Sequence, residues 1–452
     1  MLRQTMVLAL LGALCTAALA ADSVPRRLSL DESIAIALRK NRTLMAAVLD
    51  HAAAQADAGV ARGAMLPRLD AGENLSYTDN PVQAFSDLLL QQEFAQADFA
   101  PSRLNHPGFL ANFQSQVRLS FPLFAGGRLL AAYRGAGFVA DAMRWQAIEA
   151  RQRVEFAVVE AYYAAVLAEQ RIAMVDRALA AARAHLRQAE DLFGHGMAVN
   201  SDVLRTRVMV GSLEEQRIEA ESEMHVGWAA LAHALGDEDE RIAPLRNPVE
   251  LQAVAQAASP LDALVKQALA RRPEIKVVDA RVKEADEAVT VARSDYLPTI
   301  EVAGVYENDS ERLLRAGNNG ALLVTGRLNL FHGMATRSKV DAAEDRLARA
   351  RVLGQELRHA VALEVESAWR RLAAATKALE VARRNTAYAD SALKILEDRY
   401  ASGLATNVAV LDAQTTREEA DLRLVSARVA VAVDRAALNL AVGAEPQRAT
   451  ER

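Results

Sequence analysis

The residue types that could carry out chemistry are few in this sequence and lie far apart. Glu356 and His359 have the spacing of a carboxylate and a histidine ligand on one face of a di-iron helix. The corresponding positions in the first half of the chain are Glu149 and Gln152, so the second half-site has no histidine. We therefore expect Glu356 and His359 to be solvated side chains on a helix flank. A metal-bundle enzyme stays open as the weakest of three hypotheses.

Other catalytic signals are equally isolated. The eight histidines are scattered, and none lies in a sequence motif typical of a Ser-His-Asp catalytic triad. The run Gly135-Ala136-Gly137-Phe138-Val139-Ala140 fits the dinucleotide-binding fingerprint in spacing, but no strand ends just before it. The net charge is -5, and no basic stripe alternates with aromatic residues. We expect no enzymatic activity, no cofactor, no metal site and no nucleic-acid partner.

The clearest feature is a short turn that occurs twice, each time between two long helical patterns. The first copy runs from Phe193 to Leu204 and the second from Tyr400 to Leu411. Gly196 and Gly403 stand where a left-handed residue ends a helix, and small polar residues restart the next one. Aligning the two glycines gives a shift of about 207 (403 minus 196), so the chain reads as two copies of one unit.

The helices that meet at these turns have a sustained seven-residue repeat. Apolar residues step by 4 and 3 from Val361 to Tyr400, with Thr386 as the only break, and from Val154 to Phe193 in the first unit. This period predicts left-handed coiled coils. A helix from about Arg128 to Phe193 would reach roughly 100 Å, which is far longer than a globular core requires.

Each unit also contains two segments of alternating apolar and polar residues, which predict strands at about 68–78, 115–124, 299–307 and 321–331. Leu66-Pro67 and Leu297-Pro298 precede the first strand of each unit, at a shift of about 231 (298 minus 67). Four strands are too few for a membrane barrel, whose smallest known forms have about eight. The strands therefore form either a small soluble sheet or a part of a barrel shared by several chains.

The remaining segments complete the expected organisation. Residues 1–20 read as a cleaved signal peptide that contains the only cysteine, Cys15. Leu14 before it is a poor residue for a lipoprotein cleavage site, where a small residue is preferred, so we expect no lipidation. The first repeat covers 21–236, with helices 30–66 and 128–235 and a capping box at Ser29 and Glu32. A connector follows at 237–259, then the second repeat at 260–443 with helices 260–297 and 335–441, and a C-terminal tail at 444–452.

The chain resembles the TolC family of outer-membrane efflux channels in the order of its elements. The features that carry the resemblance are the duplicated helix–strand–strand–helix unit, the Leu-Pro pair before the first strand of each unit, and Phe124-Ala125-Gly126-Gly127 after the second strand. The paired tips, above all Val410-Leu411-Asp412-Ala413-Gln414, carry the most specific part of the resemblance. The resemblance implies a mainly α fold with a small β part. Long coiled-coil helices would form an α-barrel tunnel in the periplasm, and four strands per chain would join a trimeric, twelve-stranded membrane β-barrel.

The resemblance also implies function and partners. The chain would be a homotrimeric channel in the Gram-negative outer membrane, in contact with lipid, and would conduct substrates passively. An inner-membrane pump of the RND or ABC type and a periplasmic adaptor would deliver those substrates. The tips would gate the channel and dock the adaptor, and the connector would wrap the waist of the tunnel. The long first loop, 78–114, would face outside.

The resemblance further assigns residues to the tips. Relatives have two aspartates three residues apart, and this chain has Asp412 at one position but Ala409 at the other. A single Asp412 ring, tied across helices to Asp202 or Arg205, is therefore the expected constriction, since like charges close together favour cation binding. Asp412 as an ordinary solvated residue of a first helical turn stays the alternative. The adaptor-docking residues are expected to be Gly196, Asn200, Ser201, Gly403, Thr406 and Asn407.

The competing interpretation is a soluble periplasmic coiled-coil or adaptor-type structural protein with a small half-buried sheet. A half-buried soluble sheet alternates in the same way as a lipid-facing one, so periodicity alone leaves both open. The order of the duplicated elements, together with the resemblance, favours the channel.

Overall fold

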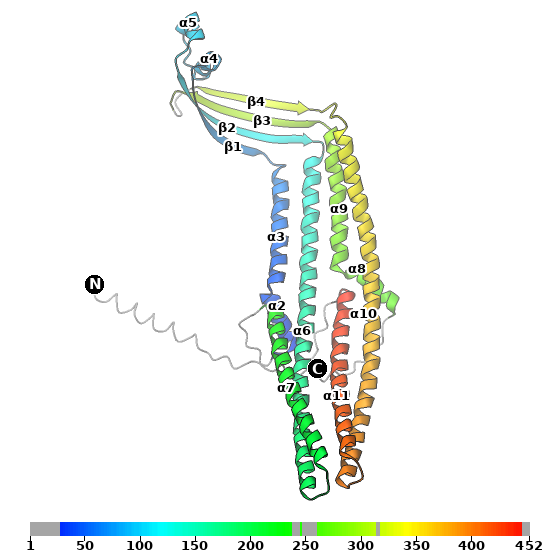
Figure 1. The fold of residues 1–452 in the computed structure, drawn as a ribbon. Coiled ribbons are helices and arrows are strands. Elements are labelled where there is room, and N and C mark those ends of the chain that lie inside the picture. Colours follow the sequence, from blue (N-terminus) through cyan, green and yellow to red (C-terminus); the bar gives the residue numbers. More distant parts are fainter. Residues whose placement is uncertain (1–27, 237–244, 246–259, 313–316, 445–452) are drawn as a thin grey trace, which may run out of the picture. The chain divides into compact units, whose positions relative to one another are not determined.

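The computed structural model describes residues 28–236, 245, 260–312 and 317–444 (Figure 1). The expected signal peptide, all of the expected connector except Leu245, and the C-terminal tail beyond Ala444 lie outside these residues. The chain divides into two compact units. The first unit comprises Met1–Ala46, Ile148–Arg272 and His359–Arg452, and the second comprises Ala47–Ala147 and Pro273–Arg358. Each unit takes segments from both sequence repeats, so the compact units differ from the repeats.

The described part of the chain is mainly helical, and its elements follow the duplicated order. The helices are α2 (Leu30–Lys40), α3 (Arg42–Gly63), α4 (Pro81–Leu90), α5 (Pro101–Asn105), α6 (Arg128–Gly194), α7 (Asn200–Leu235), α8 (Leu261–Arg271), α9 (Pro273–Arg293), α10 (Ala335–Ala401) and α11 (Asn407–Ala441), with short 3-10 turns η1 (Gln96–Phe99) and η2 (Ser294–Tyr296). Among the described residues, no helix combines the length and the apolar character that a membrane crossing requires.

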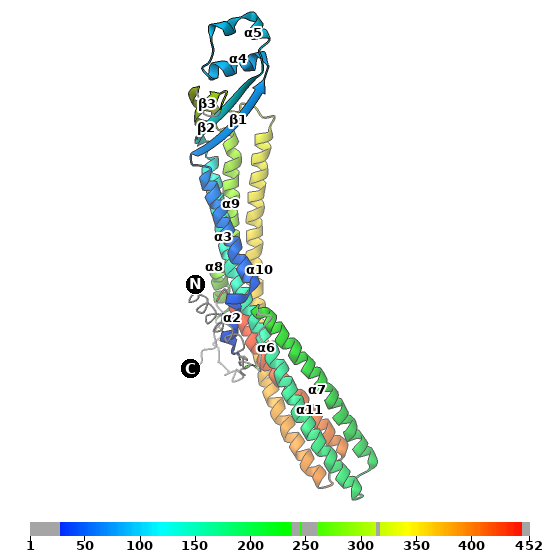
Figure 2. The same ribbon diagram turned by 90° about the vertical axis from the view of Figure 1, so that its left-hand side faces the viewer.

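The first unit contains two helical hairpins, in which α6 returns as α7 and α10 returns as α11 (Figures 1 and 2). Its largest apolar core surrounds Tyr162, which is fully buried and donates a hydrogen bond from its hydroxyl to the carbonyl of Leu28 at 3.2 Å. Gly227 on α7 allows a close approach to α6, because a Cβ there would lie 3.3 Å from the Cα of Ala165. The heptad stripes are buried as their spacing predicts, with Val361 and Val365 at 1% and 0% exposure.

The first helical segment is divided at Asn41, where we expected one continuous helix. Helix α2 begins with the predicted capping box, in which Ser29 and Glu32 exchange hydrogen bonds. Asn41 then adopts an extended conformation, and its side-chain oxygen accepts from the backbone N–H of Thr43 at 3.0 Å. The end of α7 packs against this break, because a Cβ on Gly236 would lie 2.8 Å from the carbonyl oxygen of Lys40. Tertiary packing therefore sets a boundary that helical periodicity does not show.

The second unit contains one antiparallel sheet with the strand order β1-β2-β3-β4. The strands are β1 (Arg68–Thr78), β2 (Leu110–Ala125), β3 (Thr299–Ser310) and β4 (Asn318–Arg327). The second strand begins five residues before the expected 115 (115 minus 110), and β4 ends at Arg327, before the expected 331. The loop between β1 and β2 is not irregular throughout, since it forms α4, η1 and α5.

One face of this sheet is apolar across all four strands. Pairing places Leu69 opposite Leu119, Leu119 opposite Gly304, and Gly304 opposite Leu322. Leu69, Leu119 and Leu322 are 67%, 48% and 77% exposed. On the opposite face the paired residues include Gly72, Gln116, Glu307 and Asn319. In the single chain, the apolar face is thus exposed, and among the residues that the structure describes no strand pairs with the outer edge of β1 or β4.

Candidate functional site

The two hairpin tips have the same backbone turn. In the first tip, Gly196 has φ +71°, and the N–H of Met197 donates to the carbonyl of Leu192 at 2.9 Å. In the second, Gly403 has φ +74°, and the N–H of Leu404 donates to the carbonyl of Arg399 at 2.8 Å. A glycine in the left-handed region satisfies the last carbonyls of the incoming helix in this way. The repeated sequence therefore specifies the same local turn twice.

Asn407 connects the second tip to the first hairpin. Its side chain is 2% exposed, and its Nδ2 donates to the carbonyl of Asp202 at 3.1 Å and to Oγ1 of Thr206 at 3.3 Å. Its Oδ1 lies 2.6 Å from Nε2 of His185 on α6. Because an amide oxygen only accepts, His185 donates from Nε2 in this contact. One asparagine therefore joins α11 to both helices of the other hairpin.

Tyr400 packs beside this amide contact. Its ring centroid lies 5.1 Å from that of His185, with the rings tilted by 56°, and Tyr400 is 8% exposed. Its hydroxyl is buried without a hydrogen-bond partner among the described residues. Burial raises the pKa of Tyr400 first, and the negative charge of Asp202 raises it further. The buried amide of Asn407 and the rings of His185 and Tyr400 thus hold the tip together. We call the five residues at this contact the tip cluster: His185, Asp202, Thr206, Tyr400 and Asn407.

The three residues expected at the constriction, Asp412, Asp202 and Arg205, lie in different environments. Asp202 lies in the tip cluster, where its backbone carbonyl rather than its carboxylate makes the contacts with Asn407 and Thr206. Asp412 and Arg205 are exposed. Within the described part of a single chain, neither side chain makes an ion pair, so Asp412 is not tied to Asp202 or Arg205 here. A ring of Asp412 side chains stays a prediction about an assembly.

The expected docking residues divide into one buried and five exposed positions. Asn407 is buried in the tip cluster, so its side chain does not offer a surface for a partner. The exposed positions are Gly196, Asn200, Ser201, Gly403 and Thr406. Thr406 is the N-cap of α11, and its side chain accepts from the N–H of Ala409 at 3.3 Å. A docking role for the exposed five stays a prediction, and Asn407 positions the tip from inside.

Sequence reasoning missed His185 and Thr206. His185 follows Ala178 and Ala182 at steps of 4 and 3 and precedes Ala189 by 4, and all four are buried. A histidine in such a stripe of small residues marks a polar contact inside a helix interface. The stripe is visible in the sequence, but the sequence does not show that Asn407 of the other hairpin is the partner of His185.

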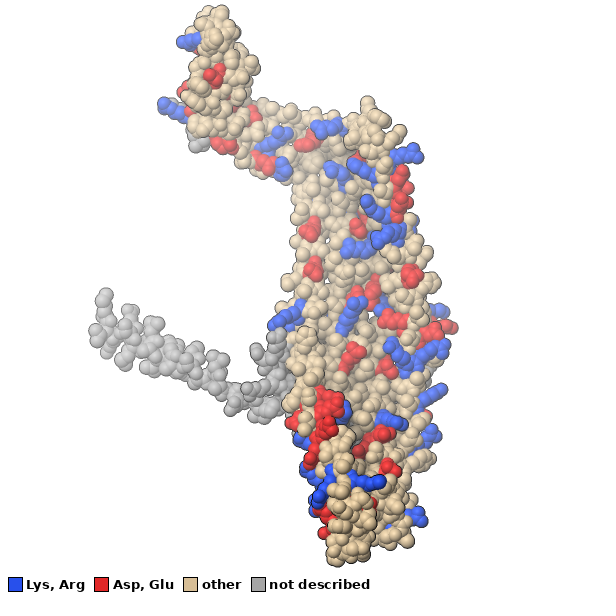
Figure 3. Space-filling view, in the orientation of Figure 1, with Lys and Arg blue, Asp and Glu red and all other residues tan. Residues whose placement is uncertain are grey.

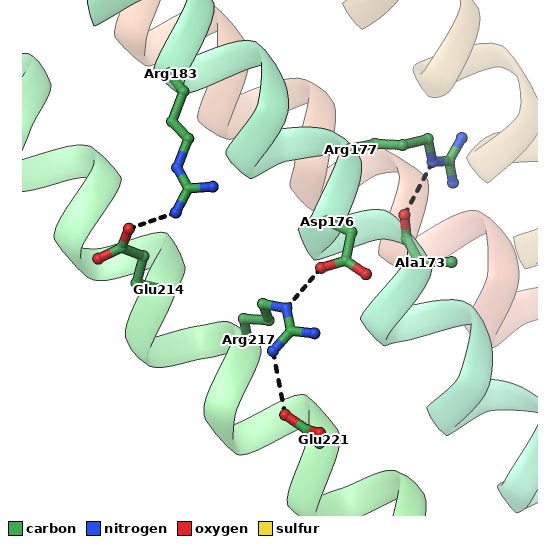
Figure 4. Close-up of polar contacts among 7 residues, drawn as sticks. All are labelled: Ala173, Asp176, Arg177, Arg183, Glu214, Arg217 and Glu221. Carbon is green, nitrogen blue, oxygen red and sulfur yellow. Dashed lines mark hydrogen bonds and ion pairs between the residues drawn. The ribbon is translucent and has the colours of Figure 1, made fainter.

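Above the first tip, ion pairs join α6 to α7 (Figure 4). Arg217 on α7 donates to Asp176 on α6 at 2.8 Å and to Glu221 at 3.1 Å, and Arg183 donates to Glu214 at 2.7 Å. A surface pocket of about 460 Å³ lies between the two helices and is lined by Asp176, Arg183, Glu214 and Arg217 together with Leu179, Ala180 and Ile218. In Figure 3 acidic and basic side chains gather over α7, whereas the tip below them is mostly uncharged. The hairpin shaft is thus charged, whereas the tip is largely uncharged and exposes apolar side chains such as Met197 and Val199.

The residues that first suggested metal chemistry are solvated. Glu356 and His359 are both exposed on α10. Among the described residues, no group of three or more His, Cys, Asp and Glu side chains is arranged to hold a metal ion. The helical Gly135–Ala140 run lies inside α6, where no phosphate-binding turn can form.

Comparison with known proteins identifies this arrangement. The chain is 28% identical over 306 residues to Protein CyaE of Bordetella pertussis, covering 66% of this chain and 64% of CyaE, slightly less than two thirds of that relative. It is 25% identical over 411 residues to the pyoverdine export outer membrane protein OpmQ of Pseudomonas aeruginosa, covering 89% and 82% of the two chains. A solved membrane protein from Pseudomonas aeruginosa has the same fold, with a TM-score of 0.79, 21% identity and 92% coverage of both chains.

A family model gives the assignment. The model for outer membrane efflux proteins matches residues 34–237 and 264–444, which is most of the chain and includes both hairpins and all four strands. The duplicated units, the four-stranded sheet and the paired tips all lie within the matched residues. The chain belongs to the outer membrane efflux protein family.

Proposed function

We propose that this chain is the outer-membrane channel of a tripartite efflux or type I secretion system. It conducts substrates passively across the periplasm and the outer membrane, and it is gated at the periplasmic helical tips. The family consists of outer-membrane channels, so the chain is an outer-membrane protein and not an enzyme. The observation that carries the proposal is the sheet, which has an exposed apolar face in register and two free edges.

The apolar face supports contact with lipid. Its exposed residues extend across four strands, and a water-facing sheet of this size would leave a patch that aggregates. The opposite face has Gln116, Glu307 and Asn319, which suit a wet lumen. A lipid face and a polar interior explain why most of the sheet is left uncovered by helices within the described chain, where α4 contacts only one end of β2 and β3.

The free edges support a homotrimer. Strand β1 has 11 residues and β4 has 10, so the two edges are matched in length. An unpaired strand edge leaves a row of backbone N–H and C=O groups that cannot stay unsatisfied in lipid. Pairing β1 of one copy with β4 of the next removes every edge, and three copies of four strands give a closed barrel of twelve.

The tips support the gate and the partners. The tip cluster joins the two hairpins of one chain, and the neighbouring residues of the tips are exposed. We propose that the hairpins of a periplasmic adaptor dock there and shift the tip cluster, so that an RND or ABC-type pump can load the channel. Cargo selectivity then belongs to the pump.

The first test is membrane fractionation of the full-length expressed protein, followed by gel migration with and without heating. We expect recovery in the outer membrane as a detergent-stable species that falls to one third of its apparent mass on heating. A soluble monomer would remove the channel proposal and support the coiled-coil structural protein instead.

The second test addresses the constriction. In planar bilayers, Asp412→Ala should weaken block by divalent and polyvalent cations by about tenfold or more, because it removes one carboxylate from each copy around the pore. Ser201→Ala is the matched control, since it changes an exposed tip residue without charge. Unchanged cation block in Asp412→Ala would exclude an Asp412 ring and leave the channel proposal intact.

A further inference from the structure

The two outer strands of the sheet carry opposite charges on the same face. Asp70 of β1 lies opposite Arg118 of β2 on the polar face described above. Arg327 of β4 lies on the same face, opposite Thr299 of β3. The Asp70 carboxylate is 48% exposed and accepts from Nε of Arg68 on its own strand at 2.7 Å. Arg327 is exposed, and among the described residues its guanidinium forms no ion pair. One free edge thus presents a carboxylate, and the other presents a guanidinium without a counter-charge.

The pairing inside the chain fixes how the two edges stand relative to each other. Arg68 pairs with Ser120, Ser120 with Ala303, and Ala303 with Leu323, so these four residues form one row across the sheet. In a barrel, β4 of one copy pairs with β1 of the next copy. Because side chains alternate between the two faces, Leu323 must then lie opposite an even-numbered residue of β1, or the polar face of one copy would continue as the apolar face of the next.

Closure of the barrel limits how far one copy is displaced along its strands relative to the next. Strands of closed barrels tilt by about 35–45°, and the tilt is set by this stagger. With strands ~4.8 Å apart and a rise of ~3.3 Å per residue, staggers of 2, 4, 6 and 8 residues for each set of four strands give tilts of about 19°, 35°, 46° and 54°. Only the staggers of 4 and 6 residues fit, and they place Leu323 opposite Gly72 (68 plus 4) or Asn74 (68 plus 6) of the next copy. Equal staggers in the opposite direction would leave almost no overlap between β4 and β1.

Charge distinguishes the two remaining registers. Arg327 follows Leu323 by four residues (327 minus 323), so its partner precedes the partner of Leu323 by four residues. The smaller stagger therefore places Arg327 directly opposite Arg68 of the next copy, and like charges directly opposite each other destabilise a sheet. The larger stagger places Arg327 directly opposite Asp70, and opposite charges in this position stabilise a sheet. The charges of the two edges thus favour the larger stagger.

The apolar face favours the same register. The larger stagger places Leu75 opposite Leu322 of the next copy and Tyr77 opposite Gly320. Leu75, Leu322 and Tyr77 are 58%, 77% and 68% exposed in the single chain. A leucine then meets a leucine, and an aromatic ring covers the backbone that a glycine leaves open. With the smaller stagger, Leu75 would lie opposite Gly320, which has no side chain to meet it.

We propose that Asp70 of each copy forms an ion pair with Arg327 of the next copy, and that this pair sets the register in which the copies join. The inference rests on the proposed trimeric barrel and adds to it the residues that specify its assembly. Asp70 then lies among three guanidinium groups, since Arg68 and Arg118 of its own chain also flank it. A slip of two residues in either direction would remove the pair with Arg327 and leave that guanidinium without a counter-charge.

Cysteine cross-linking of the full-length protein in outer membranes tests the register. The only native cysteine, Cys15, lies in the expected signal peptide, so the wild type should give no cross-link. With a short bifunctional thiol reagent, Asp70→Cys/Arg327→Cys should give covalent dimers and trimers on heated gels, because directly opposite side chains are close enough to be joined. Arg68→Cys/Arg327→Cys and Gly72→Cys/Arg327→Cys are the matched controls for a slip of two residues, and each should cross-link several-fold less. Stronger cross-linking of either control, or none of Asp70→Cys/Arg327→Cys within a detergent-stable trimer, would overturn the register and leave the trimer intact.

Charge reversal tests the same pair without cysteines. Asp70→Arg should lower the temperature at which the trimer dissociates by several degrees, and adding Arg327→Asp should restore most of this loss, because opposite charges again face each other between copies. Asp70→Arg with Arg118→Asp is the matched control, since it restores opposite charges only inside the chain, and it should restore less. Equal recovery in the two double variants would overturn the pair. Absence of a trimer in the wild type would instead remove the proposed assembly, and the pair with it.

Discussion

The two hairpin tips have the same turn but different surroundings. Asn200 and Asn407 occupy equivalent positions after their glycines, yet Asn200 is exposed and Asn407 is 2% exposed. The equivalent aromatic residues differ in the same way, since Phe193 is 45% exposed and Tyr400 is 8% exposed. Duplication has therefore preserved the local backbone, while the contacts between hairpins have diverged.

The receiving surfaces explain this difference. Asn407 meets His185, the carbonyl of Asp202 and Thr206 on the first hairpin. A shift of 207 places Ala392, Ala409 and Ala413 at the equivalent positions of the second hairpin. At these three positions the second hairpin therefore has no polar side chain that could receive the amide of Asn200.

The largest effect should come from Asn407→Ala. The substitution removes three hydrogen-bonding contacts and leaves His185 and Thr206 buried without this partner, which should cost about 1–3 kcal/mol of the contact between hairpins. Amide hydrogen exchange over residues 400–410 should accelerate, and channel conductance should rise. Asn200→Ala is the matched control and should change the free energy by less than about 0.5 kcal/mol. Equal effects at both positions would show that the tips are not functionally different.

Substitution of the two tip glycines should have equal effects. Gly196→Ala and Gly403→Ala each place a Cβ in a left-handed conformation with open space around it, at a cost of about 1–2 kcal/mol. Hydrogen exchange at the end of α6 and at the end of α10 measures the two costs separately. A clearly larger cost at Gly403 would mean that packing around Tyr400, rather than the backbone, determines the turn.

High pH should loosen only the second tip. The pKa of Tyr400 is raised by burial and by Asp202, so the folded state keeps this proton when the unfolded chain has lost it. The contribution of Tyr400 is therefore full below the ordinary tyrosine pKa of 10.0 and is lost as pH rises toward the higher folded value. The protection of residues 400–410, measured as exchange relative to the intrinsic rate at each pH, should fall above about pH 10, and Tyr400→Phe should remove this loss of protection. A similar acceleration in Tyr400→Phe would assign the pH effect to another group.

The smallest effect should come from the ion pairs on the first hairpin. Arg217 is bound to Asp176 and Glu221, whereas the equivalent residue of the second hairpin is Leu424. Arg217→Leu should slightly increase exchange along α7, and the increase should vanish in ~1 M salt, which screens exposed charges. Glu215→Gln on the same helix serves as the control. An effect that persists in high salt would point to packing by the arginine stem instead.

The sequence was sufficient for the elements and their order. The period of the apolar residues predicts α6 and α10, and alternation predicts the four strands, because both patterns reflect which side chains face a neighbour. The heptad series from Val361 to Tyr400 is largely buried as predicted, and the capping box at Ser29 is present. These features are local, and a single segment contains enough information to specify them.

Contacts between distant segments could not be read in the same way. The break at Asn41 depends on Gly236, which caps the end of α7, and the tip cluster joins residues about 200 positions apart. The short helices α4 and α5 lie in the predicted loop 78–114, whose aromatic residues show no periodicity because Phe94 packs edge to face on both Phe85 and Phe99. Such choices are made by tertiary packing, which overrides local preference.

The equal lengths of the long helices restrict how the chain can change in evolution. Helices α6 and α10 both have 67 residues, and α7 and α11 have 36 and 35. Removing one heptad from both helices of the first hairpin would move Thr206 about 10 Å from Asn407, at 1.5 Å per residue. Insertions and deletions in one repeat must therefore be matched in the other. The lengths of the two hairpins are therefore coupled, and the helices can become longer or shorter only when both hairpins change by the same number of residues.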